Sequence, residues 1–403
     1  MKKIKAFIVA ALLFTVFLVI FEISLSYKLY TDDKSMGMWN SAYKDRSYEA
    51  ISQNIGDDTM IICGSSEFAH GRNSKYHPMN MCAKDSKNWM TIGSSYNQTL
   101  LHGIAVGSVG EQMNNKKVVM LLSPTWFYKK GISPEHFELR FSETEYYHFM
   151  ENKTIPRDIK EYYAKRSEKL LSKNEGLQSK VELCNSINLG NNDSSIDEFR
   201  YNFYKGYARQ KDYITVKTSY NLDHKLYGKG RKKKYANKHK IDFKNETMLK
   251  KATKLSEKKS HNDFTMRDSN FSKLELNILG LKGSHNKDSW EQSKEYKDLE
   301  YFIRLCNSQN IELDIVLLPV NGRWYDYTGM TKDKRTVLSE NVKKIASKYN
   351  VKFDDLSKYS YDKYLTSDAV HPWNLGWVVI NERLYNFYKG GKSWKKRQKN
   401  LLF

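Results

Sequence analysis

The sequence of 403 residues has few cysteines, prolines and glycines and only one long apolar run. Its four cysteines form no CxxC pair and no Cys/His cluster of zinc spacing, and they are too sparse for a disulfide scaffold. Six prolines and 21 glycines, beside 40% hydrophobic residues, exclude a disordered or collagen-like chain. A mean hydropathy of −0.70 excludes a protein with many membrane spans, since each span needs about 20 mainly apolar residues.

Positive charge is in large excess over negative charge. The chain has 67 Lys and Arg residues against 46 Asp and Glu residues, which gives a formal net charge of +21 at pH 7. Such a field attracts a nucleic acid, an anionic membrane surface or an anionic cell-wall polymer without choosing among them. Composition therefore predicts an anionic partner and leaves its chemistry open.

The single long apolar run lies at the N-terminus. Three lysines precede it, and it begins at Ala6 and, with one interruption at Glu22, reaches Tyr27. The run predicts a membrane anchor within residues 1–30, and the lysines predict a cytoplasmic N-terminus with residues 31–403 outside the cytoplasm. A cleaved signal peptide is the alternative, but the run is long for the apolar part of such a peptide.

Short apolar runs alternate with segments of helix length in the rest of the chain. Five runs predict buried parallel strands, at residues 59–63, 89–92, 117–122, 311–318 and 351–353. The alternation predicts an α/β fold with a three-layer, doubly wound parallel sheet, whose ligand site lies beyond the carboxyl ends of the strands. Residues 133–287 have no comparable run and predict a helical insertion in this domain.

A Gly-Ser-Ser-Glu turn follows the first predicted strand directly. Here Gly64, Ser65 and Ser66 precede Glu67, at the expected start of a helix. Unpaired backbone N–H groups at a helix start favour a developing anion, so a serine at this point suits nucleophilic catalysis. The alternative is a tight turn in which a serine only caps the helix.

A second motif lies near the C-terminus, where Asp368 precedes His371 by three residues. This spacing lets one short loop present the imidazole to solvent while the aspartate accepts a hydrogen bond from the other ring nitrogen. Alone the pair is a weak signal. Together with a serine after the first strand it is specific, because chain order and distance both match one fold.

The arrangement resembles the SGNH or GDSL-like hydrolase fold and, more narrowly, the D-alanyl-lipoteichoic acid biosynthesis family called DltD. The segments that carry the closer match follow the family's order through nearly the whole chain. They are the N-terminal anchor, Gly64-Ser65-Ser66-Glu67, Ser123-Pro124-Thr125-Trp126-Phe127, Asn321-Gly322-Arg323-Trp324-Tyr325-Asp326-Tyr327-Thr328-Gly329, Asp368 with His371, and Gly376-Trp377.

The resemblance implies a catalytic triad. Ser66 is the implied nucleophile, with Ser65 as the fallback, His371 is the general base and then acid, and Asp368 orients the histidine. The implied oxyanion donors are the backbone N–H groups of Ser66 and Gly93 and one side chain. Because the family's glycine-rich stretch is replaced here, that side chain is left open between two neighbours, Asn97 and Gln98.

Residues after the predicted strands and beside the acid–base pair are expected to contact substrate. They are Ser65, Trp126, Asn321, Trp324, Tyr325 and Trp373. The alternative is that the aromatic residues among them belong to the core. The histidines near the early strands show no metal-ligand spacing, so neither a metal nor a cofactor is expected.

The function implied by the resemblance is that of a serine acyltransferase or esterase in the D-alanylation of lipoteichoic acid, in a Gram-positive cell wall. The implied partners are a glycerol-phosphate polymer, a membrane-bound O-acyltransferase, its small single-pass companion and, indirectly, the D-alanyl carrier protein. An anionic membrane is a further expected partner, and nucleic acid is not. Two alternatives stay open: hydrolysis of an acyl ester or thioester by the same triad, and a non-catalytic scaffold that presents the polymer.

Overall fold

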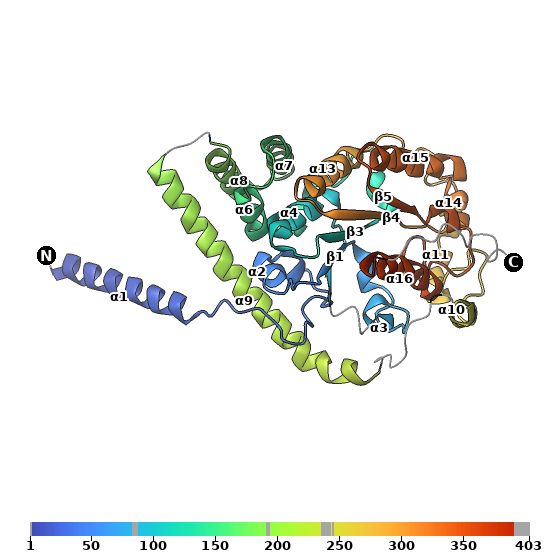
Figure 1. The fold of residues 1–403 in the computed structure, drawn as a ribbon, viewed down its shortest axis with the longest axis horizontal. Helices are drawn as coiled ribbons and strands as arrows, with labels where there is room; N and C mark the ends of the chain where they lie inside the picture. Colours follow the sequence, from blue (N-terminus) through green and yellow to red (C-terminus); the bar gives the residue numbers. More distant parts are fainter. Residues whose placement is uncertain (1, 83–87, 191–193, 235–242, 244–245, 391–403) are drawn as a thin grey trace.

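A five-stranded parallel sheet forms the centre of the protein in the computed structural model, which describes residues 2–82, 88–190, 194–234, 243 and 246–390 (Figure 1). The strands are β1 (Met60–Cys63), β2 (Trp89–Ile92), β3 (Lys117–Leu122), β4 (Glu312–Leu317) and β5 (Lys352–Asp355). Their order is β2-β1-β3-β4-β5, and every neighbouring pair is parallel. The predicted α/β fold with a parallel sheet is therefore confirmed.

The last strand lies further along the chain than the sequence predicted. It covers Lys352–Asp355 in place of residues 351–353, and all four of its residues are half-buried. Lys352 forms ion pairs with Asp314 of β4 and with Asp354. An edge strand has one solvated side, so charged residues can extend it, and an apolar run marks its end poorly.

The sheet is covered by helices on both faces, which gives three layers. Along β1, Ile61 and Cys63 point to one apolar cluster while Met60 and Ile62 point to the other, as the alternation of a strand requires. The first cluster is completed by α4 (Thr99–Val109), α13 (Glu295–Ser308) and α15 (Lys332–Lys348). The second is completed by α3 (Pro78–Met81), α10 (Glu246–Glu257) and α16 (Asn374–Tyr388).

The chain between β3 and β4 forms helices, and within its described residues no strand occurs. The helices are α5 (Pro134–Arg140), α6 (Glu143–Glu151), α7 (Arg157–Leu170), α8 (Glu175–Asn188), α9 (Ser195–Lys234), α10, α11 (Asp268–Glu275), α12 (Ile278–Leu281) and α13. Helices α5 to α9 pack on α4 through a third apolar cluster, which includes Phe137, Tyr146, Phe149 and Tyr163. Helices α5 to α9 thus add a further helical layer to one side of the molecule, whereas α10 and α11 lie near α16 (Figure 1).

The N-terminal helix α1 (Lys2–Ser24) projects away from the sheet and its covering helices (Figure 1). It is long and apolar enough to cross a membrane, and none of its described residues is buried. The chain just after α1 rests on α9, where the Ser26 Oγ and Tyr213 Oη atoms are 3.2 Å apart. The role of α1 as a membrane anchor and its orientation stay predictions.

Candidate active site

The turn after β1 requires glycine at its first position. Gly64 continues the pairing of the sheet, because its N–H donates to the Ile92 carbonyl of β2 at 2.9 Å. A Cβ atom on Gly64 would lie 2.2 Å from Glu67 Oε1 and 2.6 Å from the ring of Phe68, so that both side chains would have to move. The carboxylate of Glu67 also accepts the N–H of Ser65 at 2.6 Å. These contacts fix the turn and direct its two serines to different places.

Of the two serines, Ser66 faces the histidine. Its Oγ lies 2.8 Å from His371 Nε2, and its side chain is half-buried at the start of a short 3-10 helix (Ser66–Ala69). Ser65 is 3% exposed and donates its hydroxyl to the carbonyl of Ser94 at 3.2 Å. The geometry therefore distinguishes the two serines of the motif, because only Ser66 contacts His371.

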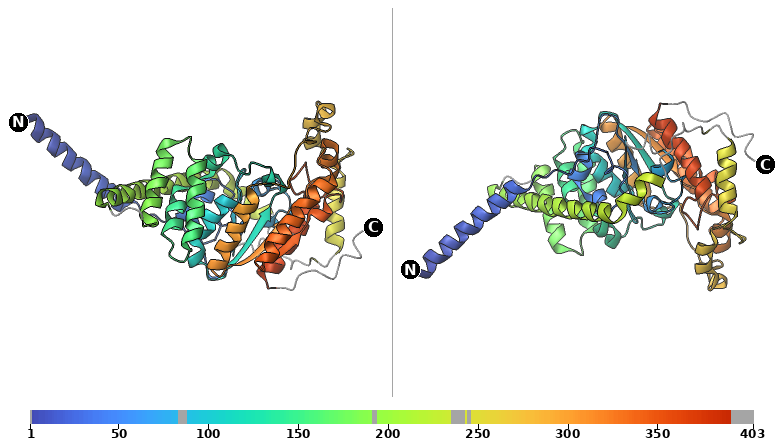
Figure 2. Two further views of the ribbon diagram at one scale, coloured as in Figure 1. Left: turned by 90° about the horizontal axis from the view of Figure 1, so that it is seen from above. Right: turned by 90° about the horizontal axis from the view of Figure 1, so that it is seen from below.

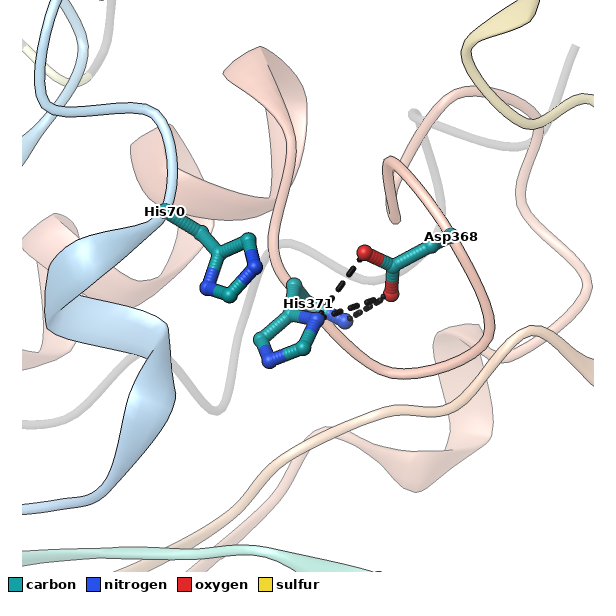
Figure 3. A group of neighbouring side chains, drawn as sticks. All are labelled: His70, Asp368 and His371. Carbon is teal, nitrogen blue, oxygen red and sulfur yellow. Dashed lines mark hydrogen bonds and ion pairs between the residues drawn. The ribbon is translucent and has the colours of Figure 1, made fainter. Parts of the chain in front are cut away.

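The loop before α16 holds Asp368 against the other side of the imidazole (Figure 3). The Nδ1 atom of His371 is 2.9 Å from Asp368 Oδ2 and 3.0 Å from Oδ1. The Oδ1 atom also accepts the backbone N–H groups of Val370 and His371, both at 2.9 Å. With a proton on Nδ1 donated to the aspartate, Nε2 offers its lone pair to the Ser66 hydroxyl.

The Asp368 carboxyl is held in its charged form. Burial is the largest effect on its pKa and raises it, but the hydrogen bonds and charge of His371, with the N–H of Val370, together outweigh burial and lower the pKa below its usual value. The aspartate therefore stays ionised throughout the neutral pH range, and it can accept a hydrogen bond from His371 Nδ1–H.

The helical insertion is hydrogen-bonded to the loop that carries Asp368. The carbonyl of Ser367 accepts the backbone N–H of Arg267 at 3.0 Å and the side-chain N–H of Asn270 at 2.9 Å. After β4, the N–H of Asn321 donates to the carbonyl of Ala369 at 2.8 Å. The contacts of Arg267 and Asn270 were not predicted, because no motif marks a distant helix start that packs against the Asp368 loop.

A second histidine, His70, lies flat against His371 (Figure 3). The ring centroids are 3.5 Å apart and the ring planes differ by 15°, while His70 Nδ1 is 2.8 Å from the Ser66 carbonyl. Burial, followed by the nearby charge of His371, lowers the pKa of His70. His70 was noted in the sequence only as one of the early histidines without metal-ligand spacing, although its place four residues after Ser66 was a usable signal.

The only potential metal-ligand group among the described residues is made of His70, Asp368 and His371, whose ligand atoms all lie within 4.8 Å of one another. A metal held by all three would compete with the hydrogen bonds that join His371 to Asp368. The arrangement therefore suits acid–base chemistry at His371 at least as well as it suits a metal.

Gly93 is placed differently from the expectation that it serves an oxyanion. Its N–H donates to Asp45 Oδ2 at 3.1 Å, and the same carboxylate oxygen accepts the Ser94 hydroxyl at 2.6 Å. A Cβ atom on Gly93 would lie 2.7 Å from the carbonyl carbon of Gly64. The glycine thus permits the two strand ends to approach, and its N–H is hydrogen-bonded to a carboxylate that no sequence motif predicts there.

The two amide candidates for the oxyanion site both lie buried at the start of α4. Asn97 is 3% exposed and Gln98 is 9% exposed. Within the described residues, the side-chain oxygen of each has no hydrogen-bond partner. A buried polar atom without a partner typically costs about 1–3 kcal/mol, so both side chains are suited to a ligand or water, and the choice between them stays open.

The aromatic residues predicted to contact substrate are almost wholly buried. Trp126, Trp324 and Tyr325 belong to the apolar cluster on the α4 side of the sheet, and Trp373 packs edge-on against Tyr364. Asn321 caps the helix that carries Trp324 by accepting its N–H at 3.0 Å. These contacts account for the residues as packing and capping groups, and their contact with substrate stays a prediction.

The buried Glu67 gives the turn a pH dependence that can be measured. Burial raises the pKa of Glu67 from about 4.5 to about 7, against the opposing effect of backbone N–H donors. The native state therefore binds this proton more tightly than the unfolded chain does, and the resulting stability is lost as pH rises through about 7. We expect Glu67→Gln, which keeps an acceptor for the Ser65 N–H, to lose less stability than the wild type between about pH 5 and pH 8. Urea unfolding of both proteins across this range measures the difference, and equal pH slopes would contradict it.

Comparison with known proteins gives the family. A family model described as "DltD protein" matches residues 34–389. The chain belongs to the DltD family. It is similar to three relatives named "Protein DltD". The relative from Bacillus subtilis (strain 168) is 29% identical over 346 residues, which are 84% of this chain and 85% of the relative. The relative from Staphylococcus aureus (strain NCTC 8325 / PS 47) is 24% identical over 334 residues, 82% of this chain and 81% of the relative. The relative from Lacticaseibacillus rhamnosus is 23% identical over 359 residues, 86% and 80% of the two chains.

Membership of the DltD family confirms the resemblance found in the sequence. The matched region begins after α1 and ends after α16, so it contains both the Gly64 turn and the loop of Asp368 and His371. DltD proteins have a role in the D-alanylation of lipoteichoic acid, and the assignment links this chain to that process.

Proposed function

We propose that this protein is a membrane-anchored serine acyltransferase that transfers D-alanine to lipoteichoic acid through an ester on Ser66. The observation that carries the proposal is one chain of hydrogen bonds, from Ser66 Oγ to His371 Nε2 at 2.8 Å and from His371 Nδ1 to Asp368 at 2.9 Å. In a DltD-family chain, this arrangement supplies a nucleophile, a base and an orienting carboxylate at one site.

The first half-reaction loads the serine. Ser66 Oγ attacks the carbonyl carbon of a D-alanyl ester or thioester, and its proton passes to His371 Nε2. Asp368 remains ionised and stabilises the imidazolium that forms. When the tetrahedral intermediate collapses, the bond to the donor breaks, and His371 returns the proton to the departing alcohol or thiol. The product is a D-alanyl ester of Ser66.

The second half-reaction transfers D-alanine from Ser66 to the polymer. A hydroxyl of a glycerol-phosphate polymer attacks the ester carbonyl, and its proton passes to His371 Nε2. The bond to Ser66 Oγ then breaks, and His371 returns the proton to that oxygen. The new ester adds an ammonium group to a chain of phosphates and so reduces the negative charge of the polymer.

The charge that develops on the carbonyl oxygen needs donors. The Ser66 N–H begins its short helix, and the first N–H groups of a helix lack acceptors within that helix. We assign the second donor to the amide of Asn97 or Gln98, whose terminal group can present N–H by rotation. Loss of one such donor typically costs about 3 kcal/mol in the transition state.

The surroundings of the protein follow from its charge and its anchor. The net charge of +21 supports binding of an anionic glycerol-phosphate polymer. The apolar helix α1 supports a membrane anchor, and the lysines at its start support an N-terminus in the cytoplasm. In this proposal the acyl group reaches the outer face through a membrane-bound O-acyltransferase and its small single-pass companion, which the D-alanyl carrier protein supplies from inside.

Two other functions use the same observations differently. Hydrolysis would follow the same first half-reaction, with water as the acceptor. A polymer-binding scaffold would need the basic charge but no alignment of Ser66, His371 and Asp368. The alignment therefore favours an enzyme over a scaffold, and the identity of the acceptor separates transferase from hydrolase.

The proposal is tested by trapping the loaded serine. Purified full-length protein is incubated with a D-alanyl thioester, quenched in acid and digested, and the peptides are measured by mass spectrometry. We expect one D-alanyl group on Ser66, which disappears when a glycerol-phosphate polymer is added before the quench. If the acyl group is lost equally fast without polymer, the protein is a hydrolase. If no serine carries an acyl group, the acyl-enzyme is ruled out and the polymer-binding scaffold is favoured.

A further inference from the structure

One face of α9 is apolar and exposed over several turns. At 100° per residue, five apolar residues and one glutamine share this face, which we call the α9 stripe: Ile196, Phe199, Phe203, Tyr207, Gln210 and Ile214. The side chains of Phe199 and Phe203 are 72% and 62% exposed. On the opposite face, Tyr201, Ala208 and Val216 are buried, so α9 packs on the rest of the protein through another surface. Large apolar residues at helical spacing on an exposed face indicate a binding surface.

The membrane anchor leaves the molecule from this same face. Gln210 lies within the α9 stripe, and its side chain is hydrogen-bonded to Glu22 in the last turn of α1. The connection is reinforced by Tyr27, whose ring centroid is 5.2 Å from that of Tyr213 and 4.2 Å from the guanidinium carbon of Arg209. In both views of Figure 2, α1 ends beside the N-terminal half of α9.

We propose that the α9 stripe lies in the headgroup region of the membrane that α1 spans. A helix that spans the bilayer ends at the lipid headgroups, so a surface in contact with its last turn is at headgroup depth. The apolar side chains from Ile196 to Tyr207 continue from that contact along the same face. This inference concerns how the protein sits on the lipid, and it does not depend on the chemistry proposed for Ser66.

The residues around the stripe have the character of an interfacial helix. Arg200 and Lys211 flank its apolar side chains and are exposed. Long basic side chains beside a buried apolar face reach anionic headgroups while their stems cover apolar surface. Tyr207 is 53% exposed and Tyr30, which follows the anchor, is 45% exposed. Tyrosine is enriched at this depth because its ring is apolar and its hydroxyl is polar.

Cysteine labelling can test the depth of the stripe. The four native cysteines are all buried, so a cysteine introduced at an exposed position is the one that reacts with a fluorescent label. Full-length Phe199→Cys and Phe203→Cys proteins are labelled and reconstituted in vesicles of phosphatidylglycerol and phosphatidylcholine. The matched control is Asn202→Cys, which is exposed on the same helix but lies on a different face. Fluorescence is quenched with a lipid that carries a nitroxide near its headgroup and, separately, with aqueous iodide.

We expect the lipid nitroxide to quench labels at positions 199 and 203 severalfold more than the label at position 202, and iodide to show the reverse order. Circular dichroism melting confirms that the variants are folded. Equal quenching at all three positions would overturn the proposal. Protection of positions 199 and 203 from both quenchers, with a doubled mass in detergent, would assign the stripe to a second copy of the chain and would overturn it too.

Discussion

Replacing Ser66 with alanine is expected to abolish transfer of D-alanine to the polymer while the protein remains folded. The Ser66 hydroxyl is the group aligned with His371 Nε2, so no ester can form without it. A half-buried hydroxyl with this hydrogen bond typically contributes about 1 kcal/mol to stability, which leaves the fold intact. Transfer is measured as labelled D-alanine incorporated into a glycerol-phosphate polymer, and folding is measured by thermal unfolding.

The neighbouring serine is the matched control. Ser65→Ala removes a hydroxyl that donates to the Ser94 carbonyl at 3.2 Å and keeps the backbone bond from Ser65 N–H to Glu67. We expect Ser65→Ala to retain most of the activity. An inactive Ser65→Ala beside an active Ser66→Ala would move the nucleophile by one position. Full activity in both variants would rule out the acyl-enzyme and favour a scaffold.

Removing the base should be nearly as damaging as removing the nucleophile. In His371→Ala the Ser66 hydroxyl keeps its proton near neutral pH, so we expect transfer to fall by about a thousandfold or more. Asp368→Asn should cause a smaller or equal loss, because the amide can no longer hold the Nδ1 proton in the same tautomer. Initial rates of D-alanyl-Ser66 formation, measured by rapid quench, give these effects for the first half-reaction alone.

The double variant tests whether the three residues act together. Adding Asp368→Asn to His371→Ala should cost little more than His371→Ala alone, since the aspartate acts through the histidine. Losses that multiply would show instead that Asp368 has a separate role. Because His371 and Val370 lower the Asp368 pKa, protonation of this carboxyl should not limit wild-type activity in mildly acidic buffer.

The fold was largely predictable because four of its five strands are short, mainly apolar and almost wholly buried. The runs that became β2 and β3 were predicted with their observed limits, since both strands have helices on each face and nearly all their residues are buried. The exposed side of β5 removes that requirement, and its polar residues escaped the prediction. The order of the strands in space follows from contacts between distant segments, which the apolar pattern of each run does not encode.

The contacts of the candidate site were likewise predictable only in part. The contact of Ser66 with His371 was expected from two local motifs and a family resemblance, and the structure brings those atoms together. The bond from Gly93 N–H to Asp45 was not expected, because Asp45 lies far upstream in a segment without a motif. His70 was not placed beside His371 although it lies four residues after Ser66, because the stacking of the two rings is set by the fold and not by a motif.

The length of chain between Ser66 and His371 bears on when reactivity first arises during synthesis. The two residues that share the 2.8 Å hydrogen bond are 305 positions apart, and β4, β5 and most of the helices lie between them. The serine emerges early, whereas the histidine emerges only when nearly all the chain has been made. Contacts of such large sequence separation form late and slowly in folding. In the proposed mechanism, Ser66 of the nascent protein therefore lacks its base, and it becomes reactive only once the C-terminal loop with His371 has folded against it.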